Sequence, residues 1–371
     1  MREPYIIWAG IDSSQNGMGV CTHNTLKILQ KKYNIDFYAL HTTGRQNSIE
    51  KRTRNKIADI VIMDLPICFG TPNWFRARKA YRSIMWDVTR LPESWVRKYY
   101  QGFDGFIMPS KFCVNTAIAS GMKGYMKVIY PPLDYNFYLP VKRKIKEPVT
   151  FVTTPMASLC CARKNMPCLV KAFKKAFGES KYVKLIIKCA TSIKKGWRSE
   201  EDRLMKEWAC SNIEIIRDFY NREQLRELLY KSHFYVLPTR GEGYCLAYRE
   251  AVLTGIPAIV TDAAACLENS PGSMFWIASD KIDGNIVMEQ LYGQADYGHA
   301  INPKASYLAE QLTMVVEKPQ FYLDAAEYDA REYSKILRRQ DEELNIDDLI
   351  QDAFSLPIRK INPKRIWPAN K

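Results

Sequence analysis

Residues 234–261 constrain the fold of this chain more than any other stretch. An apolar run at 234–237 is followed by a loop with two glycines, at 238–246, and then by a helical apolar pattern at 247–253. A glycine and a proline end that pattern before a second apolar run at 258–260. Strand, tight loop, helix and strand make up the βαβ unit of a parallel sheet, which binds ligands at the carboxyl ends of its strands. The stretch therefore predicts an α/β protein with a ligand site in loop 238–246.

The residues of this loop favour an anionic, hydroxyl-rich ligand. Gly241 and Gly243 let backbone amides approach a guest closely, and the following helix presents the positive end of its dipole. Glu242 lies in the loop, and Glu250 follows about two helical turns later. Carboxylates accept paired hydrogen bonds from sugar or ribose hydroxyls, so the pair suits a nucleotide sugar. Two solvated glutamates in ordinary ion pairs are the alternative.

The composition predicts two globular domains. A chain of 371 residues with 47% hydrophobic content can build two cores of ordinary size. No run of eighteen apolar residues occurs, and the first residues lack a long apolar segment, so we expect neither a membrane span nor a signal peptide, and a cytoplasmic protein. The ten cysteines form no CxxC pair and the four histidines lie far apart, which predicts reduced thiols and no metal site.

The positive charge of the chain is unevenly distributed. The formal net charge is +14, and residues 1–140 contain 19 Lys and Arg against 10 Asp and Glu. A basic surface suggests a polyanionic partner such as nucleic acid, an anionic membrane face or an acidic glycan. A lysine-rich composition that only aids solubility would give the same numbers.

The stretch PTRGEGYCLAYREAVLTGIPAIVTD resembles the donor-site signature of retaining GT-B glycosyltransferases of family 4. In that signature two glutamates, separated by seven residues, stand between a strand end and a glycine-proline helix stop. The resemblance implies that Glu242 contacts the transferred sugar and that Glu250 contacts the ribose of the nucleotide. It also implies that loop amides hold sugar and phosphate oxygens, namely those of Gly243, Tyr244, Cys245 and Leu246.

Two further segments resemble the same family. Lys164 falls where a lysine binds the donor diphosphate, and Arg163 can replace the family's arginine, whose place Ser158 takes. A solvated turn lysine is the alternative for Lys164. Asp87 lies in a passage similar to the family's acceptor cleft, where we expect it to orient the acceptor. Many relatives carry a histidine near that position, and this chain has none.

The remaining candidates lie in two loops that follow expected strands. Gly17 and Gly19 precede a helix expected from about Val20 to Lys32. In the family a glycine-rich loop there lines the cleft beneath the donor phosphates, whereas a plain strand-to-helix turn is the alternative. Phe219 and Tyr220 precede a helix with Asn221 as its expected N-cap, and the resemblance makes them candidates for contact with the nucleotide base.

Residues 71–92 interleave four arginines and one lysine with four aromatic residues. That pattern suits stacking on bases or sugars together with phosphate contacts. An amphipathic helix with its aromatic side chains in the core is the alternative. We also expect a basic patch at 45–56, a basic surface loop at 192–203, and helices in the chain after residue 270.

The resemblance implies a GT-B fold, with two Rossmann-like α/β domains. We expect an acceptor-binding domain at 1–140, a nucleotide-sugar-binding domain at 141–345, and at 346–371 a helix and basic tail that return to the first domain. The implied activity is transfer of a sugar from a UDP- or GDP-linked donor to an acceptor hydroxyl, with retention and without a metal or other cofactor. The acceptor is expected to be a saccharide or another hydroxyl compound. Hydroxymethylated DNA as acceptor, and a non-catalytic nucleic-acid-binding protein, are the alternatives.

Overall fold

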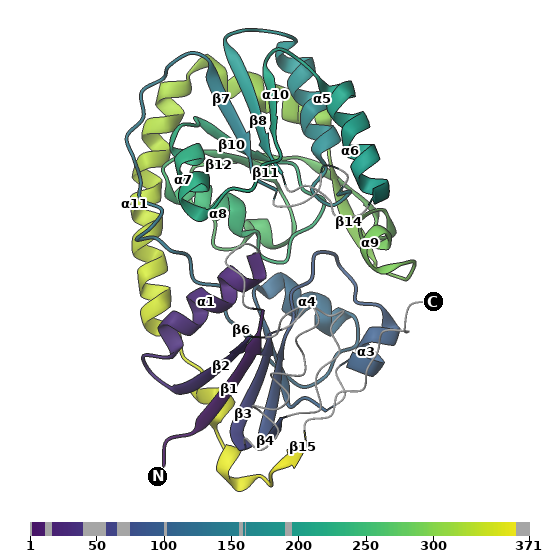
Figure 1. Cartoon of the computed structure of the whole chain (residues 1–371), viewed down its shortest axis with the longest axis vertical. Coiled ribbons are helices and arrows are strands. Elements are labelled where there is room, and N and C mark those ends of the chain that lie inside the picture. The colour runs from purple at the N-terminus through teal and green to yellow at the C-terminus, as the bar shows by residue number, and fades with distance from the viewer. Residues whose placement is uncertain are drawn as a thin grey trace. The chain divides into compact units, whose positions relative to one another are not determined.

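The computed structural model describes residues 2–11, 17–39, 57–64, 75–99, 102–155, 159, 161–189 and 195–360. The chain divides into two compact units. The N-terminal unit comprises residues 1–86, 90–132 and 339–371, and the C-terminal unit comprises residues 87–89 and 133–338. Each unit is built on its own sheet (Figure 1).

The N-terminal unit has a parallel sheet in the order β2-β1-β3-β4-β5-β6, and β15 pairs antiparallel with β4. The strands are β1 (Tyr5–Gly10), β2 (Asn34–Ala39), β3 (Ile57–Asp64), β4 (Arg76–Ser83), β5 (Gly105–Met108), β6 (Tyr125–Val128) and β15 (Arg359–Lys360). The helices are α1 (Gly17–Leu29), α3 (Glu93–Tyr99), α4 (Lys111–Ala119), α12 (Asp347–Ile350) and the 3-10 turn η2 (Ala353–Ser355). Figure 1 shows α1 on one side of the sheet and α4 on the other.

The core of this unit follows the two-residue period of its strands. In β1, Ile6 and Trp8 pack on one face of the sheet, whereas Ile7 and Ala9 pack in a separate cluster. The end of the chain completes the first cluster, because Ile346, Leu349 and Ala353 are buried in it. Residues 339–360 therefore fold as part of the N-terminal unit.

The C-terminal unit has a six-stranded parallel sheet in the order β12-β11-β10-β7-β8-β9. Its strands are β7 (Val149–Thr153), β8 (Val183–Lys188), β9 (Ile213–Ile216), β10 (Phe234–Leu237), β11 (Ala258–Thr261) and β12 (Met274–Ile277). Its helices are α5 (Met166–Phe177), α6 (Lys195–Trp208), α7 (Arg222–Tyr230), α8 (Leu246–Leu253), α9 (Asn285–Tyr292), α10 (Ala305–Glu317), the 3-10 turn η1 (Ala264–Leu267), and α11 (Pro319–Glu343), which ends in the N-terminal unit. A separate antiparallel pair consists of β13 (Ser279–Asp283) and β14 (His299–Pro303).

The order of the strands reverses at one point in the C-terminal unit. From β7 the chain adds β8 and β9 on one side, and then returns to add β10, β11 and β12 on the other. Open parallel sheets bind ligands beyond the carboxyl ends of their strands, at the point where the order reverses. In this unit that point lies between β7 and β10.

The strand–loop–helix–strand unit predicted at 234–261 is present as β10, α8 and β11. The α/β fold with two Rossmann-like units is likewise confirmed. Asn221 caps α7, since its side chain accepts a hydrogen bond from the Gln224 amide and the Gln224 side chain accepts one from the Asn221 amide. These elements can be predicted from local apolar patterns and from the residues that typically begin or end a helix.

Three expectations about secondary structure are wrong. Within the described part of 71–92, residues 76–83 form strand β4 instead of a helix. Phe75, Tyr81 and Trp86 are buried in the core, as the helix alternative expected of its aromatic side chains, and cannot stack on a ligand there. The fourth aromatic residue, Trp74, lies outside the described residues. Most of the loop expected at 192–203 belongs to α6, whose Arg203 pairs with Glu200 and Glu207 one turn away on either side. The chain after residue 270 contains strands β12, β13 and β14 besides its helices.

Candidate functional site

The point between β7 and β10 where the strand order reverses brings together charged residues from two loops of the C-terminal unit. Lys164 lies in the loop that leaves β7, just before α5 begins at Met166, and Glu242 lies in the loop that leaves β10. Both side chains are buried, and Lys164 Nζ donates a hydrogen bond of 2.6 Å to Glu242 Oε1. The alternative of a solvated turn lysine is therefore wrong for Lys164.

Glu242 is held as a carboxylate by three donors. Besides Lys164, Arg163 Nη1 lies 2.9 Å from Glu242 Oε1, and Thr239 Oγ1 donates to the same oxygen at 2.9 Å. Burial by itself would raise the pKa of Glu242, but the charges of Arg163 and Lys164 lower it to about 2. Glu242 therefore carries a negative charge at neutral pH.

Asp87 joins this cluster from a distant part of the sequence. Its Oδ1 accepts a 2.9 Å hydrogen bond from the Gly243 amide, and its Oδ2 lies 3.4 Å from Arg163 Nε. Burial raises the pKa of Asp87, and the charge of Arg163 opposes that effect. The Gly243 amide, which the resemblance assigns to a ligand oxygen, is therefore bonded to Asp87 in this structure.

Gly241 makes the contact with Asp87 possible. A Cβ atom at position 241 would lie 2.1 Å from the backbone oxygen of Asp87, which is far inside van der Waals contact. Arg163 holds the other side of the loop, because its Nη1 donates to the Gly241 carbonyl and its own carbonyl accepts from the Arg240 amide. The glycine is therefore required by close backbone approach.

Glu250 lies in a different environment from Glu242. Burial raises the pKa of Glu250 to about 7, Arg222 and a hydrogen bond with Tyr138 oppose the rise, and Asp134 adds to it. Arg222 itself pairs with Asp134 at 3.1 Å. The two glutamates of the motif therefore lie at two separate charged clusters of the same unit.

The loop amides expected to bind a ligand lie at the start of α8. Cys245 is the N-cap of this helix and has a left-handed backbone (φ 68°), although it is not a glycine. Tyr244 and Cys245 are buried, and Leu246 is half-buried in the first turn. Left-handed residues other than glycine are strained and persist where surrounding contacts fix them.

The two aromatic candidates for the nucleotide base lie beyond the end of β9. Phe219 is 63% exposed. Lys188, the last residue of β8, places its Nζ 5.2 Å from the centre of the Tyr220 ring. An exposed aromatic side chain at the carboxyl edge of a parallel sheet is available for stacking on a planar ligand.

Gly17 and Gly19 belong to the N-terminal unit and form the first turn of α1. The expectation that they precede the helix as a loop is wrong, because the helix begins at Gly17 instead of near Val20. Both glycines therefore lie at the N-terminus of the helix, where the helix dipole is positive. Gly19 is buried, whereas Gly17 is exposed.

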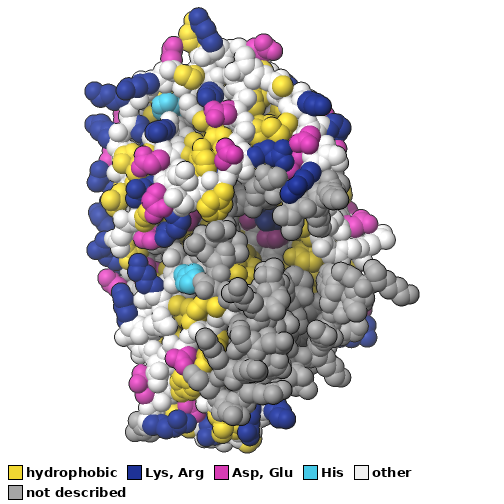
Figure 2. Space-filling view, viewed as in Figure 1, with side chains coloured by type: hydrophobic (Ala, Val, Ile, Leu, Met, Phe, Trp, Pro, Cys, Tyr) yellow, Lys and Arg dark blue, Asp and Glu magenta, His cyan; other side chains and the backbone are white. Residues whose placement is uncertain are grey.

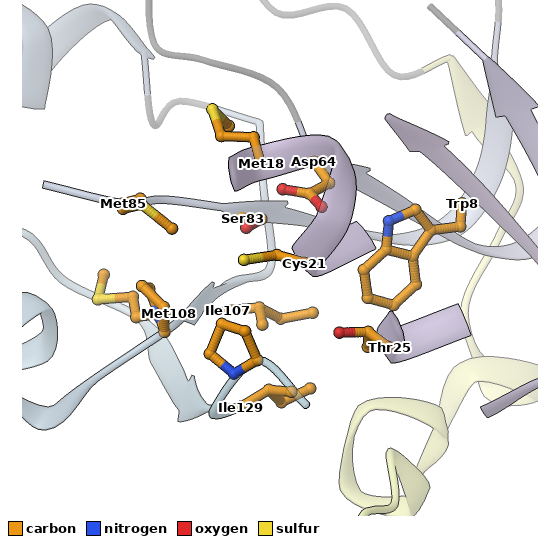
Figure 3. A pocket seen from close by; sticks show the side chains of 12 residues that line it. Trp8, Met18, Cys21, Thr25, Asp64, Ser83, Met85, Ile107, Met108 and Ile129 are labelled. Atoms are coloured by element: carbon orange, nitrogen blue, oxygen red, sulfur yellow. The ribbon is translucent and has the colours of Figure 1, made fainter. Parts of the chain in front are cut away.

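Figure 3 shows a small cavity in the N-terminal unit, at the carboxyl ends of β1, β3, β4 and β5. Its volume is about 40 Å³. Asp64 is the carboxylate at its wall, and burial raises the pKa of Asp64 although Thr22 Oγ1 donates to it at 2.6 Å. The other walls are mostly apolar, with the side chains of Met18, Met85 and Met108.

The distribution of charge is visible on one face of the molecule. In Figure 2, Lys and Arg side chains are interspersed with Asp and Glu, and they are densest along the edge that α11 occupies in Figure 1. The linker held to α11 by Gln320 contributes exposed lysines, namely Lys142, Lys144 and Lys146. The basic patch expected at 45–56 lies outside the described residues.

Two kinds of structural feature are missing from the described residues. They contain no group of three or more His, Cys, Asp or Glu side chains placed to hold a metal ion. No helix in the described ranges is long and apolar enough to cross a membrane.

Comparison with known proteins places these features in a known fold. Residues 151–284 match the family described as glycosyl transferases group 1. HepE of Anabaena, solved with UDP and glucose, superposes with a TM-score of 0.64 at 11% identity, over 92% of this chain and 98% of its own. Sucrose-phosphate synthase from Thermosynechococcus elongatus gives 0.64 at 11% identity, over 95% of this chain and 100% of its own. The chain has the GT-B fold.

A third GT-B structure, the trehalose-6-phosphate synthase OtsA, gives a TM-score of 0.61 at 10% identity, over 96% of this chain and 100% of its own. No curated protein matches the sequence. The family match covers the segment from β7 to β13, and this segment contains both Lys164 and Glu242. The expectation of a GT-B fold is therefore confirmed.

The sequence does not predict several residues of the site. Thr239 stands in the Pro-Thr strand end of the motif, yet nothing in the sequence indicates that it bonds to Glu242. Tyr138 and Arg222 lie near Glu250 because the segment that contains Asp134 and Tyr138 contacts α7, where Arg222 bonds to Asp134. Arg249, next to Glu250 in the sequence, is fully buried, and helical periodicity alone gives no sign of its contacts.

Proposed function

We propose that the protein is a glycosyltransferase that moves a sugar from a nucleoside diphosphate sugar to an acceptor hydroxyl. The observation that carries this proposal is the buried cluster of Glu242, Lys164 and Arg163 at the switch point of the C-terminal sheet. Cations fixed at this point of a parallel sheet can bind a diphosphate, and a fixed carboxylate can accept hydrogen bonds from the hydroxyls of a sugar.

The cations of the cluster would stabilise the leaving group. In the transfer, the bond between the anomeric carbon and the diphosphate oxygen breaks, and its electron pair stays on the diphosphate. Lys164 and Arg163 can then exchange part of their interaction with Glu242 for the developing negative charge. A preorganised cation in a dry site lowers the barrier because it needs no reorganisation during the reaction.

Glu242 and Gly243 would orient the transferred sugar. The ionised Glu242 accepts hydrogen bonds from sugar hydroxyls, and the Gly243 amide exchanges its bond with Asp87 for a ligand oxygen. The Asp87 carboxylate, freed from that amide, faces the reacting centre and orients the acceptor hydroxyl. The acceptor oxygen bonds to the anomeric carbon on the face that the diphosphate leaves, and the acceptor proton passes to that diphosphate. Attack on this face retains the configuration of the sugar, and the proposed step uses no metal.

UDP is the donor nucleotide that we propose, with GDP as the second choice. The reason is that HepE, a structural neighbour, was solved with UDP and glucose and with UDP-glucose. Glu250 would accept hydrogen bonds from the ribose, and Phe219 and Tyr220 would stack on the base. The transferred sugar is then a hexose, and a saccharide is the proposed acceptor.

A donor screen tests the proposal. The protein is incubated with UDP-, GDP-, ADP-, CDP- and dTDP-linked hexoses together with a mixture of saccharide acceptors, and free nucleoside diphosphate is measured. We expect release from one uridine or guanosine donor, increased by acceptor, and release at least about 100-fold slower from the Glu242→Gln variant. Absence of release from every donor, with no thermal shift on adding UDP or GDP, would contradict the proposal.

Hydroxymethylated DNA is the second candidate acceptor. The observation that favours it is the net charge of +9 within residues 1–140, which a polyanion would complement. Adding hydroxymethylated duplex DNA to the screen, at two salt concentrations, separates the candidates. Transfer to DNA that falls steeply with salt supports DNA, and salt-dependent binding without transfer to any acceptor supports the non-catalytic binder.

A further inference from the structure

Arg249 is a buried arginine that the proposed chemistry does not use. It is fully buried in α8, and no carboxylate within the described ranges forms an ion pair with it. Transferring a charged group out of water is costly unless hydrogen bonds replace the lost solvation. The contacts of Arg249 are therefore expected to serve the structure around it.

The five N–H groups of the guanidinium are matched by five acceptors. Its Nε donates to the Tyr244 carbonyl at 3.1 Å, and its Nη1 donates to the Asn269 carbonyl and to the Tyr333 hydroxyl. Its Nη2 donates to the carbonyls of Ala265 and Glu268. The planar fork of arginine can reach such a set of acceptors at once, which a lysine ammonium cannot do.

Four of these acceptors, the backbone carbonyls, lie in two segments that touch each other, and the fifth is the Tyr333 hydroxyl on α11. Tyr244 belongs to the loop that contains Glu242, and the other three carbonyls belong to residues 265–269. The Ala265 amide in turn donates to the Glu242 carbonyl at 3.3 Å. Arg249 therefore holds the Glu242 loop twice, once through Tyr244 and once through Ala265.

The backbone of both segments is strained where Arg249 holds it. Cys245, Ala264 and Asn269 all have left-handed backbones, with φ values of 68°, 57° and 48°. Such conformations cost free energy in residues other than glycine, and they persist only when other contacts fix them. Each of the three residues is an acceptor of Arg249 or directly adjoins one.

We infer that Arg249 is a positioning residue, which fixes the Glu242 loop and residues 264–269 in the geometry that the donor requires. This inference rests on the proposed function. Arg249 acts through the backbone carbonyls and does not touch the donor. Residues 264–269 are, in consequence, a fixed wall beside the donor loop instead of a lid that opens and closes.

Arg143 provides a matched control. It is also buried, and it also bonds to backbone carbonyls, namely those of Val141, Leu229 and Thr254. Thr254 follows the last residue of α8, so Arg143 holds the end of the helix opposite to the Glu242 loop. The substitutions Arg249→Lys and Arg143→Lys remove similar buried hydrogen bonds at the two ends of one helix.

The first measurement is the donor dependence of transfer by the whole protein. We expect Arg249→Lys to lower kcat/KM for the donor by about 10-fold to 100-fold, because small misplacement of reacting groups costs rates of this order. We expect Arg143→Lys to change kcat/KM by less than about two-fold. We also expect it to lower Tm by about as much as Arg249→Lys does. An equal loss of kcat/KM in both variants, or a loss of Tm alone in Arg249→Lys, would overturn the inference.

The second measurement does not need turnover. Amide hydrogen exchange is compared in the free proteins for residues 242–246 and 264–270. Arg249→Lys should exchange faster there than wild type, and Arg143→Lys should not. If Arg249→Lys does not fold, Tyr333→Phe, which removes one of the five acceptors, should give a smaller change in the same direction. Inactive wild type would overturn the proposed function, whereas unchanged exchange in the variants would overturn the role of Arg249.

Discussion

Glu242 and Glu250 belong to one motif, yet their pKa values are shifted in opposite directions. Both are affected by burial, which raises the pKa of a carboxyl group. Two cations contact Glu242 and lower its pKa to about 2. Near Glu250 the effect of Arg222 is offset by burial and by Asp134, and the pKa rises to about 7. The spacing of the motif sets where the glutamates lie, and their neighbours set what each one can do.

Glu242→Gln should give the largest effect on this comparison. The amide keeps the shape of the side chain but removes the charge that Lys164 and Arg163 contact. We expect kcat to fall by about 100-fold to 1,000-fold, measured as release of nucleoside diphosphate. Glu310→Gln, at an exposed position of α10, is the control and should leave kcat unchanged. A kcat within a factor of about three of wild type would rule out contact of Glu242 with the reacting sugar.

Lys164→Met should have the next largest effect. It removes the cation closest to Glu242 and leaves Arg163 as its only charged partner. We expect kcat to fall by about 100-fold and the free energy of unfolding to fall by about 3 kcal/mol, because one partner of a buried ion pair is lost. Chemical denaturation and donor kinetics measure the two effects.

Lys171→Met is the control for Lys164→Met, because Lys171 is exposed on α5, the helix that follows Lys164. It should change neither quantity. If both variants retain full turnover, Lys164 serves only the fold.

Gly241→Ala should separate Asp87 from the Glu242 cluster. The new Cβ would lie 2.1 Å from the Asp87 backbone oxygen, so the two segments must move apart. We expect the free energy of unfolding to fall by about 1–3 kcal/mol and transfer to fall with it. In the control, Gly272→Ala, the nearest atom is the flexible Asp329 carboxylate at 3.1 Å. Equal stability of the two variants would contradict the close contact.

Glu250→Gln should give the smallest effect and should depend on pH. The folded-state pKa of about 7 lies above the ordinary value of 4.5, so the contribution of Glu250 to stability is full below pH 4.5 and is lost as pH rises through 7. The Tm of wild type relative to Glu250→Gln should therefore fall between pH 5 and pH 8. The wild-type KM for the donor should also fall a few-fold over this range, because the ionised carboxylate accepts ribose hydrogen bonds better. A parallel pH dependence in the variant would show that another group titrates.

Much of the C-terminal unit can be predicted from the sequence. The glycines, the proline and the apolar runs around Glu242 encode their own strand, loop and helix, because each signal acts within a few residues. Strand β4 could not be predicted in the same way. Its arginines and lysine are not residue types that strands favour, so the local sequence does not indicate a strand. The segment is part of a sheet because β3 and β5 pair with it on either side.

The sequence by itself determined the βαβ unit at 234–261, the pair of glutamates and the expectation of two α/β domains. Local propensities and spacing are sufficient for these, because they depend on neighbours along the chain. Only the tertiary structure decided that Asp87 meets the Gly243 amide, that Arg163 and Lys164 neutralise Glu242, and that Arg249 holds the loop around them. These contacts join residues as many as 156 positions apart, and charge states depend on burial and partners that no local pattern encodes.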